Sequence, residues 1–424
     1  MDTIFALSSG RPPAAIGVVR ISGPAAFATV RAMAGTLPPP RRAALRTLRD
    51  AGGEVLDRAL VLAFPGPATA TGEDLAELHL HGGRAVVDAV LRTLGAMAGL
   101  RSAVAGEFTR RALINGRVDL AQAQGLADLL EAETEGARRA ALAASEGVVG
   151  RAVRGWLDRL SGVAALVEAA LDHADEDDVA EDAVERAMAE ARGLSADLAA
   201  ALDRPSVERL RDGPLVVIAG PTNAGKSSLF NALLARDAAI VTPIAGTTRD
   251  VLEATVVRDG VPYRLVDTAG LARETDDPVE AMGVARADAV IAAADVVLWL
   301  GVPADVPERG VKVHARADVA GREAPPVDSL AVSMRDPASV DRLWSLLARR
   351  VPKAAWNEAH FHDTQREALR VACAELDGFA LVVDDPLAGA EHLRIAHRAL
   401  SRLLGVDATE AMLDALFSRF CIGK

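Results

Sequence analysis

Residues 215–235 read "LVVIAGPTNAGKSSLFNALLA", which joins an apolar strand, a glycine-rich turn and the start of a helix. Residues 220–227 fit the pattern G-x-x-x-x-G-K-[ST], and the flanking strand and helix are the context that this pattern requires. The glycines let backbone N–H groups close around a β-phosphate, and the helix N-terminus adds the positive end of its dipole. We expect Lys226 to reach the β- and γ-phosphates and Ser227 to bind Mg²⁺. The segment therefore predicts a nucleoside triphosphate site.

Two further motifs follow at a normal spacing. "GTTRD" begins at Gly246, and its Thr248 is a natural switch threonine for Mg²⁺. "DTAG" begins at Asp267, which would hold Mg²⁺ through water, while the N–H of Gly270 would contact the γ-phosphate. Three motifs in this order indicate an enzyme that hydrolyses a nucleoside triphosphate.

Hydrolysis needs a residue that orients the attacking water, and the position after the DTAG glycine does not supply one. Ras-type enzymes carry glutamine there, whereas this chain has Leu271, whose side chain cannot hydrogen-bond water. The water-orienting group must come from elsewhere. Four carboxylates follow in the same segment, at Glu274, Asp276, Asp277 and Glu280.

The base-reading loop departs from the guanine pattern Asn-Lys-x-Asp. "VHARADV" (313–319) has Ala315 and Arg316 in the first two places, although Asp318 is present. The Asp318 carboxylate can accept hydrogen bonds from N1 and N2 of guanine, and Arg316 can cover the ring. "VSMRD" (332–336) would offer backbone N–H groups to guanine O6. We expect guanine to be read, but more weakly than in a complete loop.

The pattern of predicted helices and strands changes at three places along the chain. Short strands and turns fill residues 1–117, long alanine-rich helical patterns fill 118–212, strands alternate with helices over 213–350, and helices return over 351–424. The strand–helix alternation predicts a parallel α/β sheet inserted into a helical domain. Short sequence patterns predict individual elements as well. They predict strands at 16–22 and 74–81 and a hairpin turn at Asp259-Gly260. They also predict a helix stop at Asn115-Gly116 and a capping box from Asp119 to Gln122.

Composition narrows the class of protein. The net charge is −12, which disfavours broad non-specific nucleic-acid binding but leaves room for a local basic groove. Only two cysteines are present, Cys373 and Cys421, and we therefore expect a reducing, cytoplasmic location without disulfides. No apolar run is long enough to cross a bilayer, and the first residues do not resemble a signal peptide.

Several longer segments resemble the tRNA modification GTPases of the MnmE (TrmE) family across nearly the whole chain. They include "TGEDLAELHLHGG" (71–83), "GEFTRRALINGRVDLAQAQGLADLLEAET" (106–134), "IVTPIAGTTRD" (240–250) and the terminal "CIGK". The resemblance implies an α/β P-loop GTPase domain inserted into an α-helical domain, preceded by an α+β folate-binding and dimerisation domain. It also implies a homodimer that joins an MnmG-type flavoprotein in a heterotetramer and acts on the wobble uridine U34 of certain tRNAs.

The cofactors implied by the resemblance are Mg²⁺, K⁺ and a tetrahydrofolate derivative, with FAD and NADH on the partner. K⁺ would lie among Asn223, Thr242, Ile244 and Thr247 and would stimulate hydrolysis when two G domains meet. Glu280 matches the family's water-activating glutamate. Such a group is needed independently of the resemblance, because Leu271 cannot orient the attacking water. The full set expected to bind GTP is Asn223, Ala224, Gly225, Lys226, Ser227, Ser228, Thr242, Pro243, Ile244, Ala245, Gly246, Thr247, Thr248, Asp267, Thr268, Ala269, Gly270, Asp318, Ser333, Met334 and Arg335.

For folate, the resemblance points to Arg20, Glu77, Arg117 and Lys424. A carboxylate such as Glu77 can accept two hydrogen bonds from a pterin, and cationic side chains suit the ligand's carboxylates. Cys421 matches the family's near-terminal cysteine, for which a catalytic and a structural role both stay open.

Two other interpretations stay open. One is a ribosome-assembly type GTPase switch, which would need a basic RNA-binding module that we do not recognise at either end of the chain. The other, motivated by Ala315 and Arg316, is an ATP-using enzyme or a GTPase with degraded base selectivity. Asp318 argues against ATP.

Overall fold

The structure is a computed structural model that divides into two compact units. One comprises Met1–Leu130, Ala144–Ser195 and Val371–Lys424, and the other comprises Glu131–Ala143 and Ala196–Arg370. The residues that the structure describes are 2–172, 177–234, 239–240, 252–268, 287–307, 309–319, 322, 324–350, 358–382, 385–406 and 409–424.

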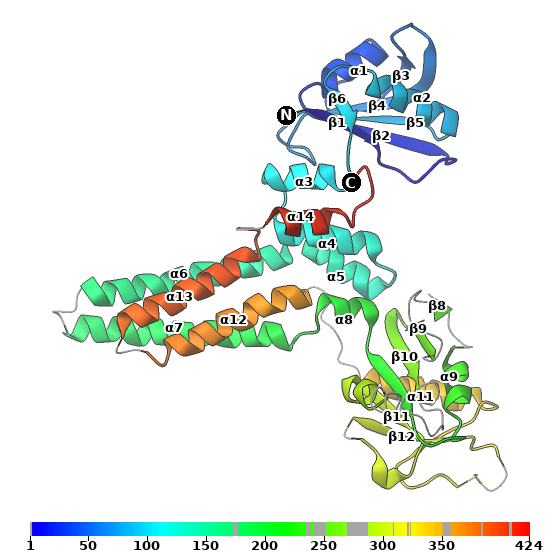
Figure 1. The fold of residues 1–424 in the computed structure, drawn as a ribbon, viewed down its shortest axis with the longest axis vertical. Coiled ribbons are helices and arrows are strands. Elements are labelled where there is room, and N and C mark those ends of the chain that lie inside the picture. Colours follow the sequence, from blue (N-terminus) through cyan, green and yellow to red (C-terminus); the bar gives the residue numbers. More distant parts are fainter. Residues whose placement is uncertain are drawn as a thin grey trace, which may run out of the picture. The chain divides into compact units, whose positions relative to one another are not determined.

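A six-stranded sheet forms the N-terminal part of the first unit, with the strand order β3-β4-β5-β2-β1-β6 (Figure 1). Its neighbours pair antiparallel except for β1 and β6, which are parallel. The strands are β1 (Thr3–Leu7), β2 (Ile16–Ser22), β3 (Ala44–Arg49), β4 (Val55–Phe64), β5 (Leu75–His81) and β6 (Leu100–Ser102).

Helices cover one face of this sheet and leave most of the other face open. The helices α1 (Ala26–Ala34) and α2 (Arg84–Gly95) bury the core beneath them, which includes Val19, Leu78 and Leu94. The strand predicted at 74–81 is confirmed as β5, and its side chains alternate, because Ala76, Leu78 and Leu80 are buried whereas Glu77 and His79 are half-buried and His81 is exposed. The opposite face therefore carries the polar side chains of β5.

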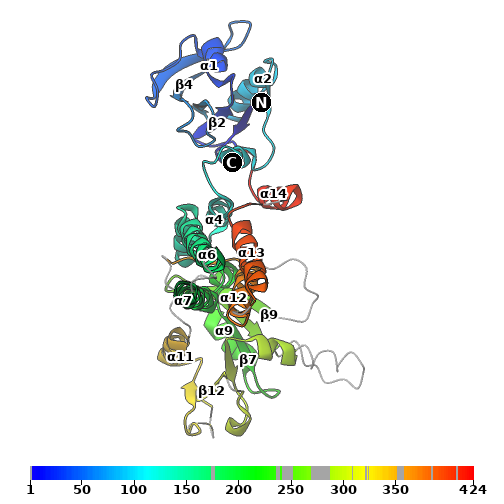
Figure 2. The same cartoon turned by 90° about the vertical axis from the view of Figure 1, so that its left-hand side faces the viewer.

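The long helices α6 (Val148–Asp172), α7 (Asp177–Asp203), α12 (Asp363–Phe379) and α13 (Pro386–Arg402) lie side by side in the helical part (Figures 1 and 2). Hydrogen bonds and ion pairs join them in turn, from Arg159 to Glu190, from Ser195 to Asp377 and from His392 to Glu375. The helices of this part are α3 (Glu107–Ile114), α4 (Leu120–Glu131), α5 (Glu135–Ser145), α6 (Val148–Asp172), α7 (Asp177–Asp203), α12 (Asp363–Phe379), α13 (Pro386–Arg402) and α14 (Glu410–Phe417).

The local helix signals are confirmed. The Asp119 N–H donates to Gln122 Oε1 at 2.9 Å, and the Gln122 N–H donates to Asp119 Oδ1 at 2.8 Å, which is the reciprocal capping box that starts α4. Helix α3 stops at Ile114, and Gly116 follows with φ +65°. Helix α7 begins at Asp177, within the acidic segment 172–182.

The second unit contains a seven-stranded sheet with the order β13-β12-β11-β7-β10-β9-β8. The five strands from β13 to β10 are parallel, as the alternation predicts, and β9 and β8 add an antiparallel edge. The predicted hairpin is confirmed, since β9 and β10 pair around Asp259 and Gly260, both with positive φ. The strands are β7 (Leu215–Ala219), β8 (Ala239–Ile240), β9 (Leu252–Arg258), β10 (Val261–Asp267), β11 (Val296–Trp299), β12 (Gly310–Ala315) and β13 (Leu330–Val332).

Helices α9 (Lys226–Leu234) and α11 (Pro337–Arg350) pack against this sheet, and α8 (Val207–Asp212) leads into it. A short 3-10 helix, η2 (Pro303–Asp305), follows β11. The central strand β7 is buried along its whole length, as expected for a strand with neighbours on both sides. Its carboxyl end therefore opens at the middle of the sheet edge, where α/β folds bind ligands.

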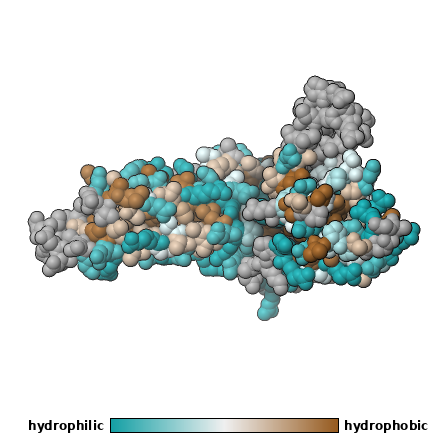
Figure 3. Space-filling view, turned by 90° about the horizontal axis from the view of Figure 1, so that it is seen from below, coloured by the Kyte–Doolittle hydropathy of each residue, from teal (hydrophilic) through white to brown (hydrophobic). Residues whose placement is uncertain are grey.

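Hydrophilic and apolar side chains are interspersed on the face seen in Figure 3. Within the described ranges, no helix combines the length and the apolar character that a membrane crossing requires.

Candidate nucleotide-binding site

The phosphate-binding loop follows β7 directly and ends at the first turn of α9. Three of its residues have positive φ, namely Gly220 at +145°, Asn223 at +60° and Gly225 at +98°. Left-handed conformations at these places curl the chain so that its backbone N–H groups face one centre. The strand, loop and helix expected from the sequence are therefore all present.

Lys226 lies at the mouth of this loop. Its Nζ donates to the carbonyl oxygens of Gly220 at 2.8 Å and Pro221 at 2.9 Å. Burial lowers the pKa of Lys226, and the negative charge of Asp267 partly offsets this effect. The ammonium group is thus held at the place where a phosphate oxygen could replace the two carbonyls as its partner.

Asp267 and Thr268 bring the second motif to the same place. Asp267 ends β10 opposite Ile218 of β7 and is completely buried. Thr268 Oγ1 donates to the carbonyl oxygen of Ile218 at 2.9 Å, which fixes the end of β10 against β7. A buried carboxylate close to Lys226 and to the start of α9 has the oxygen chemistry that Mg²⁺ prefers.

The base-reading loop contacts the phosphate-binding loop. Arg316, with φ +61°, donates from Nη1 to the carbonyl oxygen of Asn223 at 3.4 Å. A side-chain Cβ at Gly225 would lie 3.3 Å from Arg316 Cδ and 3.6 Å from the Cβ of Ala315. Gly225 therefore serves both the loop's curvature and the close approach of the base loop.

Asp318 is held by its neighbours in the ionised form. Ser333 Oγ donates to Asp318 Oδ1 at 2.8 Å, and Arg335 Nε lies 3.5 Å from Oδ2. The hydrogen bond from Ser333, followed by further donors and the nearby arginine charges, lowers the pKa of Asp318. The N–H of Arg335 bonds to Ser333 Oγ at 3.0 Å, and the side chain of Met334 is half exposed. An acceptor-only carboxylate here suits a base edge that presents two N–H donors.

Many of the sequence-predicted residues lie outside the described part of the chain. They are Thr242, Pro243, Ile244, Ala245, Gly246, Thr247, Thr248, Ala269, Gly270, Leu271 and Glu280. The described ones that gather at the edge of the second sheet are Asn223, Ala224, Gly225, Lys226, Ser227, Ser228, Asp267, Thr268, Asp318, Ser333, Met334 and Arg335.

The residues expected for folate lie on the first unit, where two of them touch. Arg20 and Glu77 face each other across β2 and β5, with Arg20 Nη2 and Nε donating to Glu77 Oε1 at 2.9 and 3.2 Å. His79 Nε2 lies 3.3 Å from Glu77 Oε2, and the Arg20 guanidinium lies 5.7 Å from the ring centre of Phe108. Arg117 instead donates to the carbonyl oxygen of Thr69 at 3.2 Å.

The C-terminal tail reaches the same domain. Ser8 Oγ donates to the carbonyl oxygen of Gly423 at 2.8 Å, and Ala105 forms an isolated bridge with Ile422. These contacts hold Lys424 near the end of β1, next to the strand that carries Arg20. Cys421 is exposed and has a free thiol.

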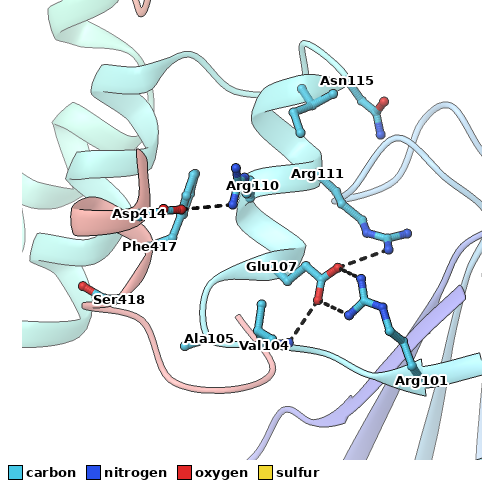
Figure 4. A pocket seen from close by; sticks show the side chains of 11 residues that line it. Arg101, Val104, Ala105, Glu107, Arg110, Arg111, Asn115, Asp414, Phe417 and Ser418 are labelled. Atoms are coloured by element: carbon cyan, nitrogen blue, oxygen red, sulfur yellow. Dashed lines mark hydrogen bonds and ion pairs between the residues drawn. The ribbon is translucent and has the colours of Figure 1, made fainter. Parts of the chain in front are cut away.

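Sequence reasoning missed an arginine network beside this tail. Arg111 is largely buried and bonds to Asp2, Glu73 and Glu107. Figure 4 shows Glu107 between Arg111 and Arg101, with which it also pairs. Of these residues, Arg101, Glu107 and Arg111 border a cavity of about 720 Å³ between α3 and α14. The signal was present in Glu107 and Arg111, four residues apart on a short helix, but the other two partners of Arg111, Asp2 and Glu73, are distant in sequence.

Comparison with known proteins covers almost the whole chain. The family description "GTP-binding protein TrmE N-terminus" matches residues 3–117, and "MnmE helical domain" matches residues 120–421. Solved structures resemble the chain only weakly. Era of Aquifex aeolicus bound to GDP·AlF4⁻ is 21% identical, covers 40% of this chain and 67% of its own, and has a TM-score of 0.26, a value that establishes nothing about this chain.

Two relatives named "tRNA modification GTPase MnmE" are much closer in sequence. The protein of Erythrobacter litoralis is 51% identical over 426 residues, covering 100% of both chains. The protein of Rhizorhabdus wittichii is 52% identical over 428 residues, covering 100% of this chain and 97% of its own. Identity of this size over the full length leaves one conclusion: the chain belongs to the MnmE family of tRNA modification GTPases.

Proposed function

We propose that this chain hydrolyses GTP and, with an FAD-dependent partner of MnmG type that uses NADH, installs a carboxymethylaminomethyl-type group on carbon 5 of U34 in certain tRNAs. The full-length similarity to tRNA modification GTPases is the observation that carries this proposal. The convergence of Lys226, Asp267 and Asp318 on one sheet edge supports the GTPase part independently.

The proposal assigns a separate role to each segment of the chain. Residues 213–350 form the G domain, inserted between helical segments 118–212 and 351–424, and residues 1–117 bind folate and dimerise. Two chains with two copies of the partner make a heterotetramer in the cytoplasm. The proposal is supported by the seven-stranded mixed sheet between helices and by the separate N-terminal sheet.

The nucleotide phosphates are bound by the loop before α9. Lys226 leaves its two backbone carbonyls and binds the β- and γ-phosphate oxygens, while Ser227 and Thr248 supply oxygens for Mg²⁺. Mg²⁺, when bound, neutralises charge that develops on the phosphates. The buried Asp267 fits this ion, because its position beside Lys226 lets it orient a water ligand.

Hydrolysis is activated by K⁺ and by dimerisation of the G domains. Asn223, Thr242, Ile244 and Thr247 hold the ion, and Glu280 orients the attacking water. Of these five residues only Asn223 lies in the described part of the chain, and its positive φ fits a loop that turns backbone and side chain toward a common centre. The test is GTP turnover in K⁺ against Na⁺, where we expect K⁺ to be faster. Equal rates would remove Asn223 as an ion ligand.

A tetrahydrofolate derivative, 5-formyl or methylene, is bound by Arg20, Glu77, Arg117 and Lys424. The Arg20–Glu77 pair supports this site, because it lies half-buried on an open sheet face beside the C-terminal tail. A pterin can compete for Glu77 with its own N–H donors. Cys421, exposed in the same tail, is a candidate thiol.

The proposal is tested by two measurements on the purified protein with its partner. Mass spectrometry of tRNA should show GTP-dependent modification of U34. Asp318→Asn should shift nucleotide preference from GTP to XTP, because the amide donates where the carboxylate accepts. Ribosome co-sedimentation without any change in tRNA modification would instead favour an assembly factor.

A further inference from the structure

Positive charge is concentrated at the N-terminal end of the chain. Residues 1–117 contain 14 arginines, no lysine and 9 aspartates and glutamates, a net charge of +5, whereas the other 307 residues carry −17, because the whole chain carries −12. A polyanion is repelled by the larger part of the chain and attracted to this domain. The N-terminal domain is therefore basic, although the net charge of the whole chain is negative.

Four of these arginines lie on or beside the outermost strand, β3, and its neighbour β4; we call Arg42, Arg46, Arg49 and Arg58 the edge arginines. Arg42, Arg49 and Arg58 are exposed, and Arg46 is half-buried. Arg58 is the cross-strand partner of Thr47, so it lies diagonal to Arg49 on the same face of the sheet. Arg46 precedes Arg49 by three residues and shares its face with the buried Leu48, so it lies on the face opposite to Arg49 and Arg58.

None of the edge arginines pairs with a carboxylate in the N-terminal domain, all of which the structure describes from residue 2 onward. Arg46 and Arg49 donate only to backbone carbonyls, those of Leu45 and Gly53. In the same domain Arg20, Arg101 and Arg111 all pair with carboxylates.

Nearby carboxylates exist but are engaged elsewhere. Asp57 accepts from the backbone N–H and from the ring of His81, at 2.8 and 2.7 Å. Asp50 accepts from the N–H of Glu54 at the hairpin turn. The positive charges of Arg42, Arg49 and Arg58 therefore lie at the exposed surface, whereas Arg46 is half-buried with its Nε atom inside the protein.

We propose that the edge arginines bind the phosphate backbone of the tRNA substrate, an inference that rests on the proposed function. Guanidinium groups bind phosphate oxygens in pairs of hydrogen bonds, and arginine suits this contact better than lysine. A group of such side chains at the edge of a sheet can position an RNA without reading its sequence. The charge separation within the chain favours RNA over an acidic protein, because it orients a long polyanion toward this domain.

The experiment measures the affinity of full-length protein, with its partner, for a fluorescent tRNA transcript over a series of salt concentrations. Replacing all four edge arginines by glutamine should weaken binding at least about 30-fold at low salt and reduce the slope of log K against log salt by about 3. Each single variant should reduce the slope by up to about 1. The fourfold Arg→Lys variant keeps the charge and should retain most of the binding.

Arg394→Gln is the matched control, because Arg394 is an exposed arginine paired with Glu391 on α13; it should leave the slope unchanged. An unchanged slope in the fourfold glutamine variant would overturn the inference. So would aggregation of that variant with unchanged tRNA affinity, since the arginines would then serve only to block pairing at the sheet edge. If the fourfold glutamine variant loses binding to the flavoprotein partner but keeps its affinity for tRNA, the edge arginines bind an acidic protein surface and the inference is wrong. If the wild-type complex binds no tRNA, the proposed function itself fails.

Discussion

Arg316 Nη1 donates to the carbonyl oxygen of Asn223 at 3.4 Å, so the loop that reads the base touches the loop that binds the phosphates. The contact spans two segments that are 93 residues apart in sequence. It occurs at the residue where this chain has arginine instead of the lysine of the guanine pattern. The substitution therefore preserves a cationic donor between the two loops.

Removing this donor should weaken nucleotide binding. We expect Arg316→Ala to raise the Kd for GTP about tenfold, because one hydrogen bond and the packing of the arginine stem over Gly225 are lost. Arg316→Lys should retain most of the affinity. Titration with a fluorescent GTP analogue measures both. Equal Kd values for the alanine variant and wild type would show that the contact does not support the bound state.

Ala315 gives a prediction of the opposite sign. Its buried methyl group lies beside Gly225, where the guanine pattern places an asparagine amide. Ala315→Asn should restore a polar contact with the base and lower the Kd for GTP about three- to tenfold, with little change for ATP. Ala317→Asn, in the same loop, is the control and should not tighten binding. A loss of affinity in Ala315→Asn would mean that the surrounding loop has repacked around alanine.

Sequence patterns predicted those features that depend on neighbouring residues. The phosphate-binding loop, the Asp119–Gln122 capping box and the Asp259-Gly260 hairpin each rest on a few consecutive residues, and each is present. The contact between Arg316 and Asn223 depends on how the carboxyl ends of β7 and β12 meet. No local spacing encodes that meeting.

In the N-terminal domain, too, local patterns predict single strands but not the contacts between segments that are distant in sequence. Alternation on β5 placed Glu77 on the polar face, and the register of β2 with β5 then brings Arg20 against it. The resemblance to a family, rather than any pattern, singled out Arg20. The Arg111 network joins residues 2, 73, 107 and 111, so it exists only once the first strand, a loop and α3 have packed together.

Arg20 should be required for folate binding and dispensable for GTP hydrolysis. Arg20→Ala removes both hydrogen bonds to Glu77 and a cation that suits the ligand, and we expect folate affinity to fall about tenfold or more. Equilibrium dialysis with 5-formyltetrahydrofolate measures this, and GTP turnover without tRNA should stay at the wild-type rate. Arg92→Ala, on the exposed side of α2, is the control. Unchanged folate affinity in Arg20→Ala would relocate the site.

The junction between α8 and α12 should depend on pH. Glu208 accepts from His362 Nδ1 at 2.8 Å and from the Asp363 N–H at 3.0 Å. Burial raises the pKa of Glu208, but the hydrogen bond from His362 and backbone N–H donors outweigh it and lower the pKa to about 2. A depressed carboxyl pKa stabilises the folded form above the unfolded value near 4.5, and this stabilisation is lost as the pH falls toward 2.

Glu208→Gln should therefore destabilise the junction at pH 6 and have little effect at pH 2. We expect a difference of about 2 kcal/mol at pH 6, seen as roughly 30-fold faster hydrogen exchange in residues 205–212. Glu375→Gln removes a similar pair with His392 elsewhere in the helices and should leave this segment unchanged. An effect of Glu208→Gln that is equal at both pH values would show that charge is not the cause.

Gly106 should be the most sensitive glycine at the contact between α3 and α14. Its φ is +68°, and a Cβ there would lie 2.6 Å from the carbonyl oxygen of Phe417. Gly116 has nearly the same φ, +65°, with no atom within 4 Å of its Cβ position. Gly106→Ala should therefore lower the free energy of unfolding by about 3 kcal/mol and Gly116→Ala by only about 1, because both variants strain the backbone but only the first also displaces α14. Thermal denaturation of the two variants separates the cost of backbone strain from the cost of the clash with α14. Equal decreases in the free energy of unfolding would mean that α14 shifts freely to accommodate the methyl group.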